Sequence, residues 1–181
     1  MDNFINTLGD TFYDKSGSVD NSSLKSVKLI GVYFSAHWCP PCRNFTPVLA
    51  NFYNTVNKNG KVFEVVFSSC DKDEKSFKEY LASMPWIALP LGSEVSNKLS
   101  GAYQVSGIPR LVILDPKGNI VNSNARNDVA SGVDCFNNWL NPESWKPAGR
   151  LCDMIGTWYM YKGQSNPVKG DRIICTITTT N

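Results

Sequence analysis

Two cysteines spaced by two residues, Cys39 and Cys42, have the type and spacing that best suit chemistry in this 181-residue chain. They enclose two prolines in the run WCPPC, which follows an apolar segment and opens a stretch of apolar residues with helical spacing. At a helix start, unpaired backbone N–H groups and the helix dipole favour an anion. The thiolate is the reactive form, and a free cysteine titrates near ~8.5. We therefore predict that Cys39 is the nucleophile and that Cys42, one turn further in, is more buried.

This pair predicts thiol–disulfide exchange, in which the Cys39 thiolate forms a mixed disulfide with a substrate and Cys42 resolves it. Such a reaction needs no metal and no organic cofactor. A zinc site is the alternative for this spacing, but zinc needs four ligands. The sequence has no second C-x-x-C, and His37 is its only histidine. A purely structural pair is disfavoured because such pairs rarely lie at a strand-to-helix junction.

A second motif, Ile108-Pro109, stands just before an apolar strand. Proline is tolerated at the first residue of a strand, which is the plain interpretation. The alternative is a cis-proline loop that faces the cysteines and offers the Ile108 backbone to an extended substrate. The residues alone leave both open. In the second interpretation the substrate-binding residues are Trp38, Pro40, Pro41, Ile108 and Pro109.

Several neighbouring side chains allow two interpretations each. His37 either stabilises the thiolate or is a solvated loop residue, and we favour the latter. Arg43 and Arg126 either contact substrate or are solvated surface cations, and again we favour the latter. Cys70, at a strand end, is expected to be a small buried residue rather than a redox partner. Trp38 either shields the site or simply packs.

Apolar periodicity predicts the elements that position these residues. The first half reads as two strands with helices between them, which implies a parallel pair; the second half reads as a hairpin followed by a helix. The whole is an α/β pattern. The expected elements are helix 3–8, loops at 15–23, strand 27–35, a helix from the WCPPC run to 57, strand 62–68, a helix starting at 71–74, helix 95–103, strand 111–114, turn 115–118, strand 119–122 and helix 133–140.

Composition excludes several classes of protein. The net charge is +2 with mixed signs, so nucleic acid and membrane surfaces are not expected partners. No apolar run approaches the ~20 residues of a membrane helix, and the N-terminus has no signal-peptide pattern. Six scattered cysteines do not make a disulfide scaffold. We expect a cytoplasmic protein, with the nucleus as a second location.

The chain divides into residues 1–147, one α/β domain, and residues 148–181, a C-terminal extension. Strand-like runs at 157–161 and 172–180 flank a turn-rich segment, which predicts a β-hairpin. Because a lone hairpin is marginal in water, we expect this extension to dock on the domain or on another chain.

Taken jointly, these motifs resemble the nucleoredoxin and tryparedoxin branch of the thioredoxin superfamily over roughly residues 1–140. The resemblance rests on residues 32–43 (VYFSAHWCPPCR), 45–47 (FTP), 63–68 (FEVVFS), 71–74 (DKDE), 84–86 (MPW) and 107–109 (GIP). It implies a thioredoxin fold, a central mixed sheet flanked by helices, with a cis Pro109. It also implies reduction of protein disulfides through Cys39 and Cys42.

The partners implied are disulfide-containing proteins and an electron donor, either a small dithiol or a reductase. Tryparedoxins take electrons from trypanothione and pass them to peroxidases, whereas nucleoredoxins also act as redox-sensitive partner-binding proteins. Besides an enzyme, two further interpretations are therefore open. The chain is either a partner-binding module whose cysteines only switch its affinity for the partner, or a fixed subunit of a larger assembly.

One position departs from ordinary thioredoxins, which have a buried aspartate six residues before the first active cysteine. Here that residue is Tyr33. A tyrosine, with a pKa near ~10, is a poor proton acceptor at neutral pH. We therefore expect bound water, or an acidic residue elsewhere in the chain, to be the proton acceptor.

Overall fold

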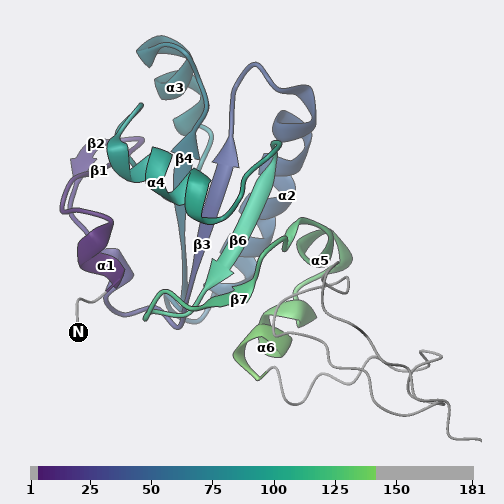
Figure 1. Cartoon of the computed structure of the whole chain (residues 1–181). Coiled ribbons are helices and arrows are strands. Elements are labelled where there is room, and N and C mark those ends of the chain that lie inside the picture. The colour runs from purple at the N-terminus through teal and green to yellow at the C-terminus, as the bar shows by residue number, and fades with distance from the viewer. Residues whose placement is uncertain (1–3, 142–181) are drawn as a thin grey trace, which may run out of the picture.

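A computed structural model describes residues 4–141, which form one mixed sheet between two layers of helices (Figure 1). The strand order is β2-β1-β5-β4-β3-β6-β7. The strands are β1 (Phe12–Asp14), β2 (Gly17–Val19), β3 (Leu29–Ser35), β4 (Phe63–Ser69), β5 (Ile87–Ala88), β6 (Arg110–Leu114) and β7 (Ile120–Asn122). The helices are α1 (Phe4–Thr7), the 3₁₀ turn η1 (Ser22–Leu24), α2 (Pro40–Val56), α3 (Glu74–Leu81), α4 (Glu94–Ala102), α5 (Arg126–Ser131) and α6 (Asp134–Leu140).

Strand β3 lies inside the sheet between β4 and β6, and all seven of its residues are buried. Its apolar run suits a strand covered on both faces. It pairs in parallel with β4, as predicted, and antiparallel with β6. The predicted antiparallel hairpin is the pair β6 and β7. The α/β pattern with a mixed sheet is therefore confirmed. Antiparallel pairing sets Phe34 opposite Arg110, so the end of β3 and the start of β6 share one edge of the sheet.

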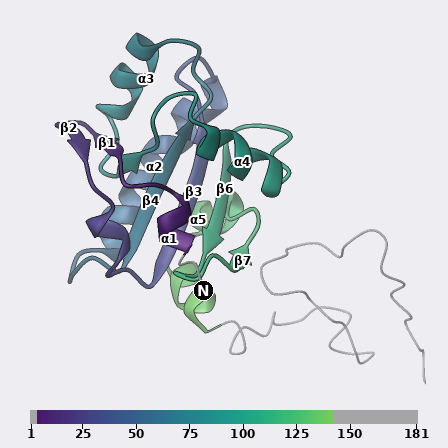
Figure 2. The ribbon, with the colours of Figure 1, turned by 60° about the vertical axis from the view of Figure 1, so that its left-hand side comes forward.

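The two faces of the sheet bury different sets of side chains (Figures 1 and 2). Helices α1 and α4 cover one face. The other face carries α2, α3, α5 and α6 over an aromatic core. Helix α2 contributes Phe45, Leu49 and Phe52, whose spacing places them on one side of the helix. Full burial of each such side chain stabilises the fold by roughly 1.5–3 kcal/mol.

Some predicted elements need correction. The segment 15–23, expected to be loops, contains β2 and η1. Helix α5 and the two-residue strand β5 were not predicted. Strands of two or three residues lack enough positions for an alternating pattern to show. The C-terminal hairpin and the domain boundary at 147 lie outside the described residues and stay predictions.

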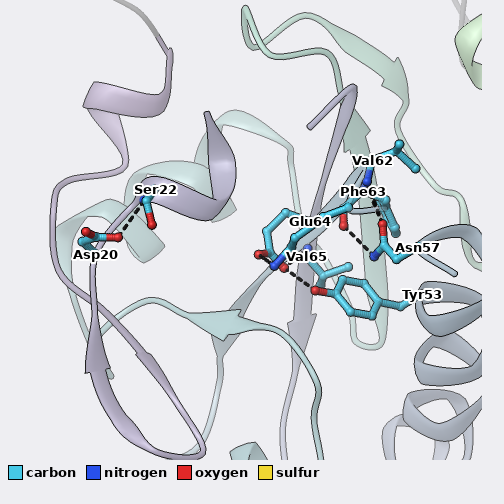
Figure 3. Close-up of polar contacts among 9 residues, drawn as sticks. Asp20, Ser22, Tyr53, Asn57, Val62, Phe63, Glu64 and Val65 are labelled. Carbon is cyan, nitrogen blue, oxygen red and sulfur yellow. Dashed lines mark hydrogen bonds and ion pairs between the residues drawn. The ribbon is translucent and has the colours of Figure 1, made fainter. Parts of the chain in front are cut away.

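A side-chain amide fastens the end of α2 to the start of β4 (Figure 3). Asn57 follows the last residue of α2, and its Oδ1 accepts the N–H groups of Val62 and Phe63 at 2.8 and 3.0 Å. Its Nδ2 donates to the Phe63 carbonyl at 2.9 Å. These bonds fix the turn between helix and strand, and thereby the seating of α2 on the sheet.

Glu64 on β4 is a fully buried carboxylate, and both of its oxygens interact with neighbouring groups (Figure 3). The Tyr53 hydroxyl on α2 and the Val65 N–H both donate to its Oε1 at 3.0 Å. The Lys61 ammonium forms an ion pair with Oε2. Burial, with the Glu64 charge as a second cause, raises the pKa of Tyr53, so its hydroxyl stays protonated and donating.

We predict that Tyr53→Phe lowers the free energy of unfolding by about 1.5–3 kcal/mol, because it removes a hydrogen bond to a buried charge. Urea denaturation measures this. Tyr13→Phe is the matched control, since no hydrogen bond involves the Tyr13 hydroxyl within the described residues; its effect should stay within about 0.5 kcal/mol. Equal losses of unfolding free energy in the two variants would show that the hydrogen bond from Tyr53 to Glu64 does not stabilise the fold.

Candidate active site

The junction of β3 and α2 places Cys39 at the start of the helix. Cys39 is the N-cap residue of α2, with extended backbone angles (φ −92°, ψ 109°), and its Sγ accepts the Cys42 N–H at 3.4 Å. Pro40 and Pro41 occupy the first two helical positions, where no N–H has an intrahelical partner. The sulfur thus takes the place that an oxygen side chain usually takes in a helix cap.

Cys39 and Cys42 form a disulfide with their Cα atoms 5.2 Å apart. Both are buried, Cys39 at 4% and Cys42 at 0% exposure, so Cys42 is the deeper one, as predicted. Ala36 and Ile108 pack against the pair. The sulfur of Cys39 is therefore the one nearer to the surface.

The Ile108–Pro109 peptide bond is cis. The Ile108 carbonyl oxygen lies 3.9 Å from Cys39 Sγ, and Pro109 is buried. Of the two interpretations left open by the residues, the structure has the cis-proline loop that faces the cysteines. Ile108 itself is only half-buried, so this loop borders the disulfide at the protein surface.

Asp71 holds the loop that precedes the cysteines. Its Oδ1 accepts the His37 N–H and its Oδ2 accepts the Ser69 hydroxyl, both at 2.8 Å. Arg43 donates to the His37 carbonyl at 2.7 Å. Sequence reasoning placed Asp71 only at a helix start and missed this role. A polar residue just past the end of a buried strand was the available signal.

Among the large apolar side chains that the structure describes, that of Trp38 is the most exposed, with 57% of its surface accessible. Its indole N–H donates to the Cys70 carbonyl at 3.2 Å, which fixes the orientation of the ring. Pro40 and Pro41 are exposed as well. The three predicted substrate-binding residues of the WCPPC run are therefore all exposed, and they flank or follow Cys39 in the chain.

The predictions for Arg43 and Arg126 are confirmed, whereas the prediction for His37 is wrong. Arg43 and Arg126 are exposed cations, and Arg126 lies over the Phe45 ring at 5.9 Å. His37 is half-buried and stacks on Tyr80, with ring centroids 5.5 Å apart, so the expected solvated loop histidine is wrong.

Cys70 is exposed rather than buried, which corrects its prediction, because β4 ends at Ser69 and leaves it beyond the sheet. Desolvation and the neighbouring Asp71 charge nevertheless raise the pKa of the Cys70 thiol. Cys135 is the other free cysteine of the described residues, and burial followed by the Asp128 charge raises its pKa to about 12. Neither thiol has the environment of an activated nucleophile.

Tyr33 belongs to a buried group of hydroxyls behind Cys42, which we call the hydroxyl cluster: Tyr33, Ser35, Thr46 and Tyr80. Burial, and then the nearby Tyr80, raise the pKa of Tyr33 well above its usual range. Its hydroxyl therefore stays protonated and cannot act as the base that an aspartate would be.

Residues 4–141 show neither a metal-binding cluster nor a membrane-spanning helix. This part of the chain contains no group of three or more His, Cys, Asp or Glu side chains placed to hold a metal ion. None of its helices is long and apolar enough to cross a membrane.

Comparison with known proteins agrees with this geometry. The thioredoxin-like family model matches residues 26–120. Tryparedoxin of Trypanosoma brucei brucei is 42% identical over 125 residues, which cover 68% of this chain and 85% of that protein. Mouse nucleoredoxin is 44% identical over 119 residues, 65% of this chain. The chain spans only 27% of the length of that nucleoredoxin.

A solved structure, tryparedoxin II complexed with glutathionylspermidine, superposes with a TM-score of 0.62 at 34% sequence identity. The match covers 75% of this chain and 89% of that one. At 34% identity the two proteins are related in sequence as well as similar in fold.

We predict that Asp71→Ala loosens the active-site loop, because the His37 N–H and the Ser69 hydroxyl lose their acceptor. The free energy of unfolding should fall by about 1–3 kcal/mol, and hydrogen exchange at the His37 amide should accelerate. Asp73→Ala, which removes only the cap of α3, is the control. Unchanged exchange at His37 in Asp71→Ala would show that another group holds the loop.

Proposed function

This chain belongs to the thioredoxin-like family, and we propose that it is a thiol–disulfide oxidoreductase that reduces protein disulfides through Cys39 and Cys42. The observation that carries the proposal is the position of the Cys39–Cys42 disulfide. It lies at the N-terminus of α2, with Cys39 as the cap and the Ile108–Pro109 loop beside it. Its relationship to nucleoredoxin and tryparedoxin supports the same conclusion.

Cys39 is the nucleophile in this proposal. In the reduced protein, the Cys42 N–H and the helix dipole stabilise its thiolate. The thiolate attacks one sulfur of a substrate disulfide, a mixed disulfide forms, and the other substrate sulfur leaves with the electron pair. Cys42 completes the turnover. Its thiolate attacks Cys39 Sγ, which releases the reduced substrate and restores the disulfide seen here.

The surface around Cys39 supports a protein substrate. Trp38, Pro40 and Pro41 are exposed, and in this proposal they form an apolar patch beside the disulfide. Ile108 packs against the cysteine pair, and in this proposal its backbone pairs with an extended substrate segment. An extended segment on such a loop gains main-chain hydrogen bonds without a requirement for one sequence.

The electron donor that we propose is a small dithiol or a reductase. Tryparedoxin II was solved in complex with glutathionylspermidine, which supports a small thiol compound as the donor for this chain. The free thiols of Cys70 and Cys135 suit a reducing compartment, the cytoplasm or the nucleus. No further cofactor takes part, since the electron pair passes from sulfur to sulfur.

A redox-sensitive partner-binding module is the second candidate, and the likeness to nucleoredoxin favours it. In that case the same apolar patch holds a partner, and oxidation of the cysteines changes its affinity. Turnover with dithiothreitol and a disulfide protein separates the candidates, because a pure binding module does not turn over.

We predict that Cys39→Ser reduces turnover below a few per cent of the wild-type rate and leaves the fold intact, because the attacking sulfur is lost. An insulin reduction assay with dithiothreitol measures this. Cys135→Ser is the matched control and should keep wild-type activity, since Cys135 lies on α6. Activity retained in Cys39→Ser would exclude the mechanism.

Cys42→Ser should still attack a disulfide but should stall as a mixed disulfide, because no second sulfur is present to resolve it. Mass spectrometry after incubation with oxidised insulin detects the adduct, and dithiothreitol removes it. The double variant Cys39→Ser/Cys42→Ser should form none. An equal yield from both variants would mean that another cysteine is the nucleophile.

A further inference from the structure

Arg110 is the first residue of β6 and directly follows the cis-proline Pro109. Its backbone pairs with Phe34, near the end of β3, so it lies at the end of the sheet from which the chain leads into the cysteines. Alternation along β6 puts Arg110 on the same face of the sheet as Val112, the face that α1 and α4 cover. Ile108 packs against the core of that face and also against the cysteine pair. The Arg110 side chain therefore begins beside the loop to which the proposed function assigns the substrate.

The guanidinium of Arg110 has no partner within the described residues. Its Nε is enclosed and makes no hydrogen bond. The two terminal amino groups make neither a hydrogen bond nor an ion pair with residues 4–141, and they are not enclosed, so they reach solvent. An arginine whose stem is held inside the protein and whose amino groups lie at the surface presents a planar fork of donors in a fixed orientation.

The other two arginines of residues 4–141 do have partners. Arg43 donates to the His37 carbonyl at 2.7 Å, and Arg126 lies over the Phe45 ring at 5.9 Å. The four ion pairs of this part of the chain each join a lysine to a glutamate. Arg110 is thus the one arginine of the described residues whose charge has no counterpart. Because a partly enclosed donor without an acceptor costs free energy, an acceptor from another molecule would stabilise it.

The two segments that build the site carry no acidic residue. Segment 29–57 comprises β3, the active-site loop and α2, and segment 99–114 runs from the end of α4 through the cis-proline loop to β6. Their only arginine, lysine, aspartate or glutamate residues are Arg43 and Arg110. Asp71 reaches the active-site loop from beyond β4, but it is buried and accepts two hydrogen bonds. These segments therefore contribute only positive charge around the site, which favours an anionic ligand.

We propose that Arg110 is a specificity-determining residue that binds a carboxylate of the protein substrate, an inference that rests on the oxidoreductase function proposed above. The substrate segment that pairs with the Ile108 backbone passes the start of β6, where an aspartate or glutamate near its cysteine meets the guanidinium. Arginine and carboxylate form two parallel N–H···O bonds. Arg110 takes no part in the sulfur exchange itself. The preferred substrate is therefore a disulfide protein with an acidic residue close to the reactive cysteine.

Three short peptides that differ only in the residues flanking one cysteine test this preference. The cysteine carries a 2-pyridyl disulfide, and its neighbours are aspartates, asparagines or lysines. The purified, full-length reduced protein attacks the peptide sulfur, and absorbance follows the thiopyridone that leaves. Cys39→Ser gives the background from the other cysteines. Wild type should react about fivefold faster with the aspartate peptide than with the asparagine peptide, and most slowly with the lysine peptide.

Substitutions at Arg110 identify the source of the preference. Arg110→Gln should react equally fast with the aspartate and asparagine peptides. Arg110→Lys keeps the charge but not the planar fork, so it should retain only part of the preference. Lys117→Gln is the matched control, because it removes the same charge from the exposed turn at the other end of β6 and should keep the fivefold ratio. Each ratio compares two peptides on one protein, so a less stable variant still gives a valid result.

Two results would overturn the proposal. One is a wild-type ratio near one, or the same ratio in Arg110→Gln as in wild type. The other is a loss of the preference in Lys117→Gln as well, which would show a response to net charge rather than to one side chain. Supporting evidence would come from salt, since an ionic strength of about 1 M should weaken the preference of wild type.

Dihydrolipoate and dihydrolipoamide test whether the carboxylate belongs instead to the electron donor. These two dithiols differ in a carboxylate and an amide. Each should reduce the oxidised protein equally fast in wild type and in Arg110→Gln. A dependence on Arg110 that appears with dihydrolipoate, and not with the peptides, would assign the residue to the donor and overturn its assignment to the substrate.

The asparagine peptide keeps this proposal distinguishable from the oxidoreductase function. If wild type reduces that peptide through Cys39 but shows no preference for aspartate, only the role of Arg110 is wrong. If no peptide reacts above the Cys39→Ser background, the oxidoreductase function itself is wrong and the substrate preference falls with it.

Discussion

The structure depends on one hydrogen bond, from the Cys42 N–H to the sulfur of Cys39. It caps α2 and at the same time holds the reactive sulfur against the positive end of the helix. A cap of this kind requires that the chain leave β3 in an extended conformation and turn at once into a helix, and the two prolines that follow favour that turn. Asp71 and the main chain around His37 hold the entry to the turn in place. The local chemistry of the site is therefore a consequence of how one helix begins.

The rest of the fold serves to hold that helix start against the sheet. The aromatic core holds α2 against the sheet along the length of the helix, and Asn57 fastens the far end of α2 to the start of β4. The antiparallel pairing of β3 with β6 brings the Ile108–Pro109 loop to the same edge of the sheet as the cysteines. At that edge Cys39 borders the surface and Cys42 is enclosed. This asymmetry suits one sulfur for attack on a substrate and the other for resolution.

Sequence alone was sufficient for features with a local cause. The buried strand 29–35, the helix start at Cys39 and the antiparallel hairpin of β6 and β7 follow from apolar patterns and from the spacing of the cysteines. Features that arise from tertiary contacts were not predictable in this way. Asp71 and Tyr80 are separated from the cysteines by about 30 to 40 residues, so only the pairing of β3 with β4 and the packing of α3 reveal their contacts. The exposure of Cys70 and the stacking of His37 on Tyr80 escaped prediction for the same reason.

The central claim is that the position of Cys39 makes it the reactive thiolate of the protein. Alkylation of the fully reduced protein by iodoacetamide at pH 7, with peptide mapping over time, tests this most directly. Burial and neighbouring carboxylates raise the pKa of Cys70 and of Cys135, whereas Cys39 has the helix N-terminus beside it. The account predicts that Cys39 reacts more than about tenfold faster than either of them. Equal rates, or faster alkylation of the exposed Cys70, would contradict it.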